Sequence, residues 1–297
     1  MLKEKSYCLL FSLLAFIFFS CVSQKKVAPV KKELTSVNDQ LLKYENDLNG
    51  LDDQRRKKQE LNEIDDTVVN RFQTFISNTN TEINAIVSDN NLLIHGAIVN
   101  KADWEHLNKN LFKSQQTSKK INEKVMILSD LINRTTVIRL DQDVIFEPGQ
   151  YTVTNAVANA IGKFFEPAAK EIDQFVNKYP DFPLSLIISA KGYADGTSIS
   201  EGTILYKNLR ERLNLNTKVP DNKELNKELS RARAEAVIDL FKNFTVGMAK
   251  SGNNIKHIAY IYEGKGEVLP NPSILDYKTD DARRRIVLLY WSVFPDD

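Results

Sequence analysis

Cysteine and histidine are scarce in this chain, and their scarcity excludes several kinds of site. Both cysteines, Cys8 and Cys21, lie within the first 21 of 297 residues. The remainder can therefore form no disulfide, zinc site or thiol nucleophile. The three histidines, His95, His106 and His257, have no spacing that would pair them. We therefore expect no enzyme activity, no metal and no cofactor.

An excess of either charge is also missing. Forty basic side chains stand against 39 acidic ones, a net charge of +1. No global basic field is available for nucleic acid, and no acidic excess of the kind found in disordered tails is present. A hydrophobic content of 42% is ordinary for a folded protein. We expect one or two folded domains and no nucleic-acid partner.

The apolar run at the start of the chain is short. It extends from Tyr7 to Phe19 after two lysines, and its length of about 13 residues falls short of the ~20 needed to cross a bilayer as a helix. The run has the length of the apolar core of a signal peptide. An uncleaved anchor helix is the alternative. Either way, we expect the body of the protein to be exported and tethered to a membrane.

Ser20-Cys21 directly follows this run and resembles the lipobox of bacterial lipoproteins. In that family the signal peptide is removed before the cysteine, which then carries lipid. The resemblance implies a signal peptide at 1–20, a lipidated Cys21 and a tether at 21–33. It also implies an outer membrane lipoprotein that faces the periplasm.

Proline is absent between Pro29 and Pro148, and only Gly50 and Gly96 interrupt this stretch. So long a stretch without helix breakers predicts a helical or coiled-coil region at 34–133. A continuous coiled coil of about 100 residues would be ~150 Å long at ~1.5 Å per residue. A helical hairpin or three-helix packing, folded near 88–103, is the other architecture, and Gly96 favours it. The apolar seam has the spacing of a coiled coil at Leu34, Val37, Leu41, Tyr44, Leu48 and Leu51.

From residue 135 onward, short β-branched runs alternate with helical patterns. The order predicts a β-α-β-α-β-β sandwich with helices on one side of the sheet. The fold class is therefore α+β, with an N-terminal helical coiled-coil or hairpin rod followed by this sandwich. The predicted elements are a strand pair or bent strand at 135–146, a helix at 167–179 with Pro167 in its first turn, a buried strand at 184–195 ending at Gly192, a helix at 228–244, and strands at 255–267 and 284–294.

Four short motifs follow one another in the second half of the chain. They are Gly192-Tyr193-Ala194-Asp195, Asn226-Lys-Glu-Leu229-Ser230-Arg-Ala-Arg233-Ala234-Glu-Ala-Val237, Gly264-Lys-Gly266-Glu267-Val-Leu-Pro270 and Arg284-Arg285-Ile286-Val287. In this order they resemble the OmpA-like peptidoglycan-binding domain, which would occupy 134–297. The second motif matches at every fixed position and is the most specific of the four.

The resemblance implies a ligand and three binding residues. In that family the ligand is the diaminopimelate of the peptidoglycan stem peptide, a residue that carries an ammonium and a carboxylate at its tip. By resemblance, Asp195 accepts from the ammonium, Arg233 grips the carboxylate and Asn226 braces the loop. Arg231 lies about 200° further round the helix and would face solvent. Arg284 and Arg285 are expected to stabilise the sheet edge.

An insertion at about 197–224 separates Asp195 from Asn226. It would extend the pocket, cover it as a lid, or block it. The leading prediction is an envelope protein that binds peptidoglycan and links membrane to wall. The alternative is a scaffolding lipoprotein with a blocked pocket, which acts through protein partners or self-association of its helical region. A channel stator shares this domain type but needs an acidic residue in its membrane helix, and 7–22 contains none.

Overall fold

The computed structural model describes most of the chain in six segments. The described residues are 23–98, 100–134, 136–147, 149–214, 219–245 and 254–296. The predicted signal peptide and Cys21 lie outside them. The chain divides into two compact units, Met1–Asp52 with Gln73–Met126, and Asp53–Phe72 with Ile127–Asp297. The domain boundary predicted at 134 stays a prediction.

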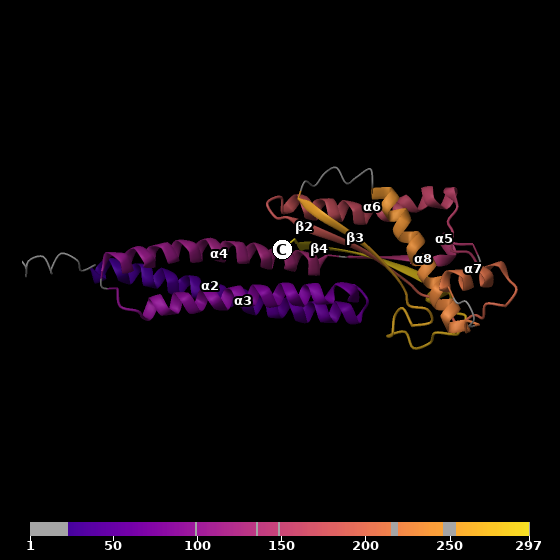
Figure 1. The fold of residues 1–297 in the computed structure, drawn as a ribbon, viewed down its shortest axis with the longest axis horizontal. Coiled ribbons are helices and arrows are strands. Elements are labelled where there is room, and N and C mark those ends of the chain that lie inside the picture. Colours follow the sequence, from indigo (N-terminus) through magenta and orange to yellow (C-terminus); the bar gives the residue numbers. More distant parts are fainter. Residues whose placement is uncertain are drawn as a thin grey trace, which may run out of the picture. The chain divides into compact units, whose positions relative to one another are not determined.

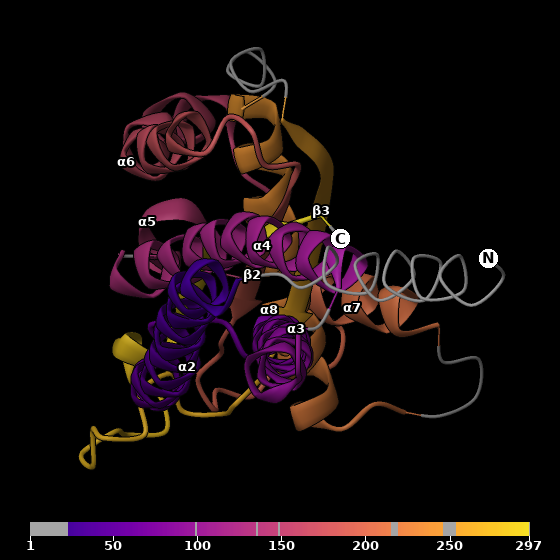
Figure 2. The same ribbon diagram turned by 90° about the vertical axis from the view of Figure 1, so that its left-hand side faces the viewer.

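Three long helices supply the first unit: α2 (Gln24–Glu60), α3 (Val69–His95) and α4 (Lys101–Asn133). They lie side by side in Figures 1 and 2, so the chain adopts the folded alternative and not the continuous coiled coil. Between α3 and α4 the chain folds back at Gly96, within the predicted range 88–103. An added Cβ at Gly96 would lie 2.8 Å from the carbonyl oxygen of Leu92, which suits glycine to the end of α3. Residues 24–33, predicted as a tether, already belong to α2.

The core of the first unit contains a polar layer as well as the predicted seam. All six seam residues from Leu34 to Leu51 are buried. Asn90 donates to Asn38 Oδ1 at 2.8 Å and accepts from Ser114 Oγ, also at 2.8 Å. One buried amide thus joins α2, α3 and α4. Because the bonds require matching heights on three helices, this layer specifies the register of the bundle.

A four-stranded sheet with the order β1-β4-β2-β3 forms the centre of the second unit. The strands β2 and β3 are parallel, and the other two pairs are antiparallel. Every residue of β2 and all but the last of β4 are buried, because these two strands are central. The α+β class and the β-α-β-α-β-β order are confirmed. The strands are β1 (Val137–Asp141), β2 (Leu184–Gly192), β3 (Ile255–Gly264) and β4 (Ile286–Pro295).

The helices of this unit differ from the sequence predictions in two places. The segment 135–146 is neither a strand pair nor a bent strand, because the chain leaves β1 directly into the short helix α5 (Gln142–Ile145). The helix α6 (Asn155–Lys178) begins well before Pro167, because Thr154 caps it by accepting from Val157 N. Two further helices are α7 (Ile204–Leu213) and α8 (Asn222–Thr245), and 3-10 turns occupy Asp66–Val68 and Ala282–Arg284.

Both faces of the sheet are covered, which corrects the prediction of helices on one side only. The helices α6 and α8 pack on the first face, where Phe175 and Trp291 meet with ring centroids 6.3 Å apart. On the opposite face, the buried ammonium of Lys191 pairs with Asp65 at 2.6 Å. Phe72 also packs edge-on against Phe294 there, with centroids 4.9 Å apart. Residues 61–72 therefore complete the core of the second unit.

Candidate functional site

The site is built where α8 crosses the ends of β2 and β3, and glycines permit this close approach. An added Cβ at Gly192 would lie 1.9 Å from the carbonyl oxygen of Ser230, and one at Gly264 would lie 2.2 Å from that of Lys227. The hydroxyl of Ser230 accepts from Gly266 N at 2.9 Å and donates to Lys227 O at 2.8 Å. These motif residues therefore serve packing, and they position the polar side chains of α8 beside the end of β2.

Asp195 lies just beyond β2, is buried, and is already paired. Its Oδ2 accepts from Arg285 Nη1 at 2.8 Å, and its Oδ1 accepts from Thr197 N at 3.0 Å. Burial alone would raise the pKa of Asp195, but these hydrogen bonds hold it below its ordinary value of 3.8. Asp195 is therefore an ionised carboxylate with a cation at one oxygen.

Arg233 is buried on α8, whereas Arg231 is exposed, as their two-residue offset predicts. Arg233 Nε donates to Gln150 O at 3.0 Å, and its Nη1 donates to Gln142 Oε1. Burial lowers the pKa of Arg233 to about 10, opposed by the carboxylates of Asp143 and Asp195. The guanidinium is therefore charged at neutral pH, and the negative charge of Asp195 stabilises it.

Asn226 braces the loop that follows Asp195. Its Nδ2 donates to Thr197 O at 3.2 Å and to Glu267 Oε1 at 2.9 Å. Because Thr197 N also donates to Asp195, the amide of Asn226 fixes the loop on which Asp195 lies. A contact between Asn226 and a ligand stays a prediction.

Arg285 belongs to this cluster, whereas its sequence context predicted a role at the sheet edge. It donates to Asp143 through Nε at 3.1 Å and Nη2 at 2.7 Å, in addition to its bond to Asp195. Gln142 completes the set, because its Nε2 donates to Tyr193 O at 2.7 Å. The pairing of β1 with β4 places Asp141 opposite Ile286 and so brings these residues together. Only the register of β1 on β4 would have indicated that Arg285 and Gln142 lie at this site.

Arg284, the neighbour of Arg285, has a structural role, but in a loop and not at the sheet edge where it was predicted. Its guanidinium is buried and donates to the backbone, to Glu267 O at 2.7 Å and to Lys278 O at 3.3 Å. It therefore secures the loop between β3 and β4. Of the two adjacent arginines, only Arg285 reaches a carboxylate of the cluster.

The insertion packs on α8 through its helix α7. Tyr206 and Leu209 of α7 form a buried cluster with Leu225 and Leu229 of α8. Arg212 adds ion pairs to Glu228 at 2.8 Å and Glu235 at 2.6 Å. The two ion pairs lie on the opposite side of α8 from Asn226, Ser230 and Arg233, whereas Leu229 is one helical turn from Arg233.

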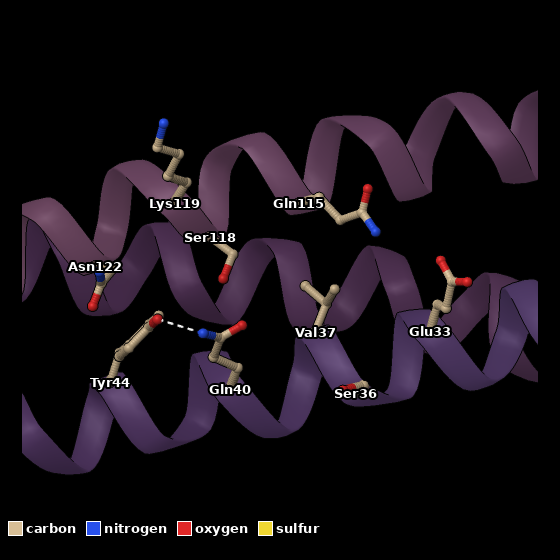
Figure 3. A pocket seen from close by; sticks show the side chains of 9 residues that line it. All are labelled: Glu33, Ser36, Val37, Gln40, Tyr44, Gln115, Ser118, Lys119 and Asn122. Atoms are coloured by element: carbon tan, nitrogen blue, oxygen red, sulfur yellow. Dashed lines mark hydrogen bonds between the residues drawn. The ribbon is translucent and has the colours of Figure 1, made fainter.

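A polar groove of about 430 Å³ lies between α2 and α4 in the first unit (Figure 3). Within it, Gln40 donates to the hydroxyl of Tyr44 at 2.6 Å. Its other lining residues include Glu33, Ser118 and Lys119. It contains none of the predicted site residues.

The described residues offer neither a metal site nor a membrane-spanning helix. The described part of the chain holds no group of three or more His, Cys, Asp or Glu side chains that could bind a metal ion. None of the helices within the described ranges is both long and apolar enough to span a bilayer. The predicted signal peptide lies outside these ranges.

Comparisons with known proteins give matches only among solved structures. One is a MotB-like protein from Desulfovibrio vulgaris, with 18% identity, 52% of this chain and 73% of that chain covered, and a TM-score of 0.28. Another is the OmpA-like domain of FopA1 from Francisella tularensis subsp. tularensis SCHU S4, with 17% identity, 54% and 72% coverage, and a TM-score of 0.26. No family model and no curated protein matches the chain.

Proposed function

We propose that this chain is a cell-envelope protein that binds peptidoglycan non-covalently through the diaminopimelate of the stem peptide. In this proposal Asp195 accepts from the ligand ammonium, Arg233 donates to its carboxylate and Asn226 holds the loop. The observation that supports it best is a buried guanidinium that interacts electrostatically with an ionised carboxylate at one end of the sheet. Gln142 accepts from Arg233 and donates to the carbonyl of Tyr193, two residues before Asp195.

The ion pair between Arg285 and Asp195 is compatible with ligand binding at Asp195. If a ligand ammonium replaces Arg285 at Asp195, Arg285 retains its two bonds to Asp143, at 3.1 and 2.7 Å. One cation then replaces another at the same carboxylate oxygen. No buried charge is left without a partner, which would otherwise be costly.

Weak affinity is sufficient for such a protein. Each charge-assisted hydrogen bond contributes about 1.5–3 kcal/mol, while association costs several kcal/mol. A lipid on Cys21 would confine the protein beside a lattice of repeated stems. Rebinding then occurs at high effective concentration, so the chain would link the membrane to the wall.

Cosedimentation of the full chain with purified sacculi tests the site. We expect Asp195→Asn and Arg233→Lys to reduce bound protein about tenfold, equivalent to ~1.4 kcal/mol each. Arg231→Lys is the matched control, since Arg231 lies on the same helix but faces solvent, and it should bind as the wild type does. Equal retention of all three variants would reject the site.

The scaffolding alternative has its own support, because Asp195 and Arg233 are both satisfied by groups of this chain. In that case the cluster is structural, and the protein acts through partners or self-association. A wild-type chain that ignores sacculi but copurifies with a fixed protein would favour it.

A further inference from the structure

The guanidinium of Arg233 is enclosed by one short stretch of chain. Gln142 and Gln150 each accept a hydrogen bond from it, and the ring of Phe146 lies 5.4 Å from Cζ. A bidentate grip on a carboxylate uses two neighbouring nitrogens of the guanidinium. At the Nε–Nη2 edge, Nε already donates to Gln150 O at 3.0 Å. A ligand carboxylate must replace that carbonyl to use this edge.

The carbonyl belongs to a tight turn, which we call the strap, residues Gly149–Tyr151. Gly149 has φ +71°, a left-handed conformation that glycine adopts without strain. Gln150 N donates back to Glu147 O at 2.9 Å. The turn thereby directs the Gln150 carbonyl at Arg233. The strap supplies a neutral oxygen where the ligand would supply a charged one.

The insertion helix α7 holds the strap from outside. The guanidinium of Arg212 lies 5.5 Å from the centroid of the Tyr151 ring. Arg212 is itself fixed by Glu228 and Glu235 of α8. Tyr151 also packs against the buried cluster of Tyr206, Leu209, Leu225 and Leu229. Contacts of α7 therefore favour the position of the strap in which the Gln150 carbonyl accepts a hydrogen bond from Arg233.

We infer that the strap is a built-in competitor for the carboxylate ligand of Arg233, and that α7 sets how often it opens. This inference rests on the proposed function, since it concerns the same site. The insertion then regulates the site and does not block it. Binding requires the Tyr151 contact with α7 to loosen, after which the ligand carboxylate replaces the Gln150 carbonyl.

Loosening the strap should strengthen binding. When a binding-competent state is populated about 10% of the time, the apparent Kd is about tenfold above the intrinsic one. Tyr151→Ala and Arg212→Gln each remove one side of the strap contact. We therefore expect each to lower the Kd for the tripeptide L-Ala-γ-D-Glu-meso-diaminopimelate, by up to about tenfold.

Titration calorimetry on the full chain in mild detergent measures this change. Tyr260→Ala is the matched control, because Lys242 lies over the Tyr260 ring at the same 5.5 Å but away from the strap. The same tripeptide with L-lysine in place of diaminopimelate lacks the second carboxylate and controls for the ligand. Tyr260→Ala should leave the Kd unchanged, and the lysine peptide should bind no variant.

A second measurement reports strap opening without a ligand. Phenylglyoxal modifies accessible guanidinium groups, and mass spectrometry resolves each site. Arg233 should react more slowly than the exposed Arg231 in the wild type, and several-fold faster in Tyr151→Ala. The diaminopimelate tripeptide should protect Arg233 and leave Arg231 unchanged.

The outcomes separate the two proposals. If no variant binds the tripeptide and Arg233 is never protected, the proposed function is wrong. If the wild type binds but Tyr151→Ala and Arg212→Gln change neither the Kd nor the reactivity of Arg233, the strap is not a competitor. Weaker binding by either strap variant would overturn the inference as well, since it would make the strap part of the ligand site.

Discussion

At the scale of single residues, two clusters of charged side chains in the second unit differ in their exposure to solvent. One is the cluster of Asp195, Arg233 and Arg285, which is connected to solvent-exposed Asp143. The other is Lys191 with Asp65, whose side chains are only 3% and 1% exposed. Ser189 also donates to Asp65. The second group is almost fully enclosed by the protein, so we assign it to stability.

Removing one member of the Lys191 pair should be strongly destabilising. Lys191→Met leaves Asp65 as an uncompensated buried charge, and we expect the free energy of unfolding to fall by about 3–5 kcal/mol. Urea denaturation followed by circular dichroism measures this loss. Asp65→Asn in the same chain should recover part of it. Lys242→Met, a change at an exposed lysine, should cost ~1 kcal/mol or less, and a similar cost for both lysines would contradict the assignment.

At the scale of elements, the position of α8 decides whether a site exists. The helix lies against β2 and β3 only because Gly192 and Gly264 have no side chain at the crossing. This contact sets Asn226 and Arg233 level with the residues that follow β2. Gly192 and Gly264 therefore contribute to the site by allowing a short distance between α8 and the sheet.

A methyl group at Gly192 should disturb that contact. Its Cβ would lie 1.9 Å from a backbone oxygen of α8, which a rotamer change cannot relieve. We expect Gly192→Ala to lower the free energy of unfolding by at least about 1–3 kcal/mol, measured by urea denaturation. Gly50→Ala is the control, because no atom lies within 4 Å of its added Cβ, and in a helix it should stabilise by ~0.5–1 kcal/mol. Equal effects would show that the close approach is unimportant.

At the scale of the whole molecule, the second unit is not continuous in sequence. It takes Asp53–Phe72 from the helical half of the chain and Ile127–Asp297 from the rest. Residues 61–72 cover one face of the sheet, with Asp65 on Lys191 and Phe72 on Phe294. A fragment that begins at 134 lacks all of these contacts.

We therefore expect the fragment 134–297 not to fold as the full chain does. The fragment would expose Phe294 and leave Lys191 without Asp65. Thermal unfolding followed by circular dichroism should show no cooperative transition for the fragment, with 23–297 as the reference. A cooperative transition within ~4 °C of the reference would show that residues 61–72 are dispensable. For the same reason, the sacculus experiment requires the full chain.

Much of the fold was predictable, since local patterns determine it. Apolar periodicity and the lack of helix breakers predicted the long helices, and β-branched runs alternating with helical patterns predicted the order of elements and the buried strand ending at Gly192. The start of α6 was missed, because Pro167 looked like a helix start while the Thr154 cap lies further upstream. The strand pair at 135–146 was wrong, because α5 forms where Gln142 finds partners on Tyr193 and Ile286.

The sequence by itself determined which residues carry charge beside the strand end, and that Arg233 and Arg231 face opposite ways on α8. Helix geometry and local motifs suffice for both. Only the tertiary structure decided that Asp195 is paired with Arg285, that Gln150 occupies Arg233, and that residues 61–72 close the sheet. These contacts join positions far apart in the chain, and their register depends on β1 pairing with β4 and on α7 packing against α8.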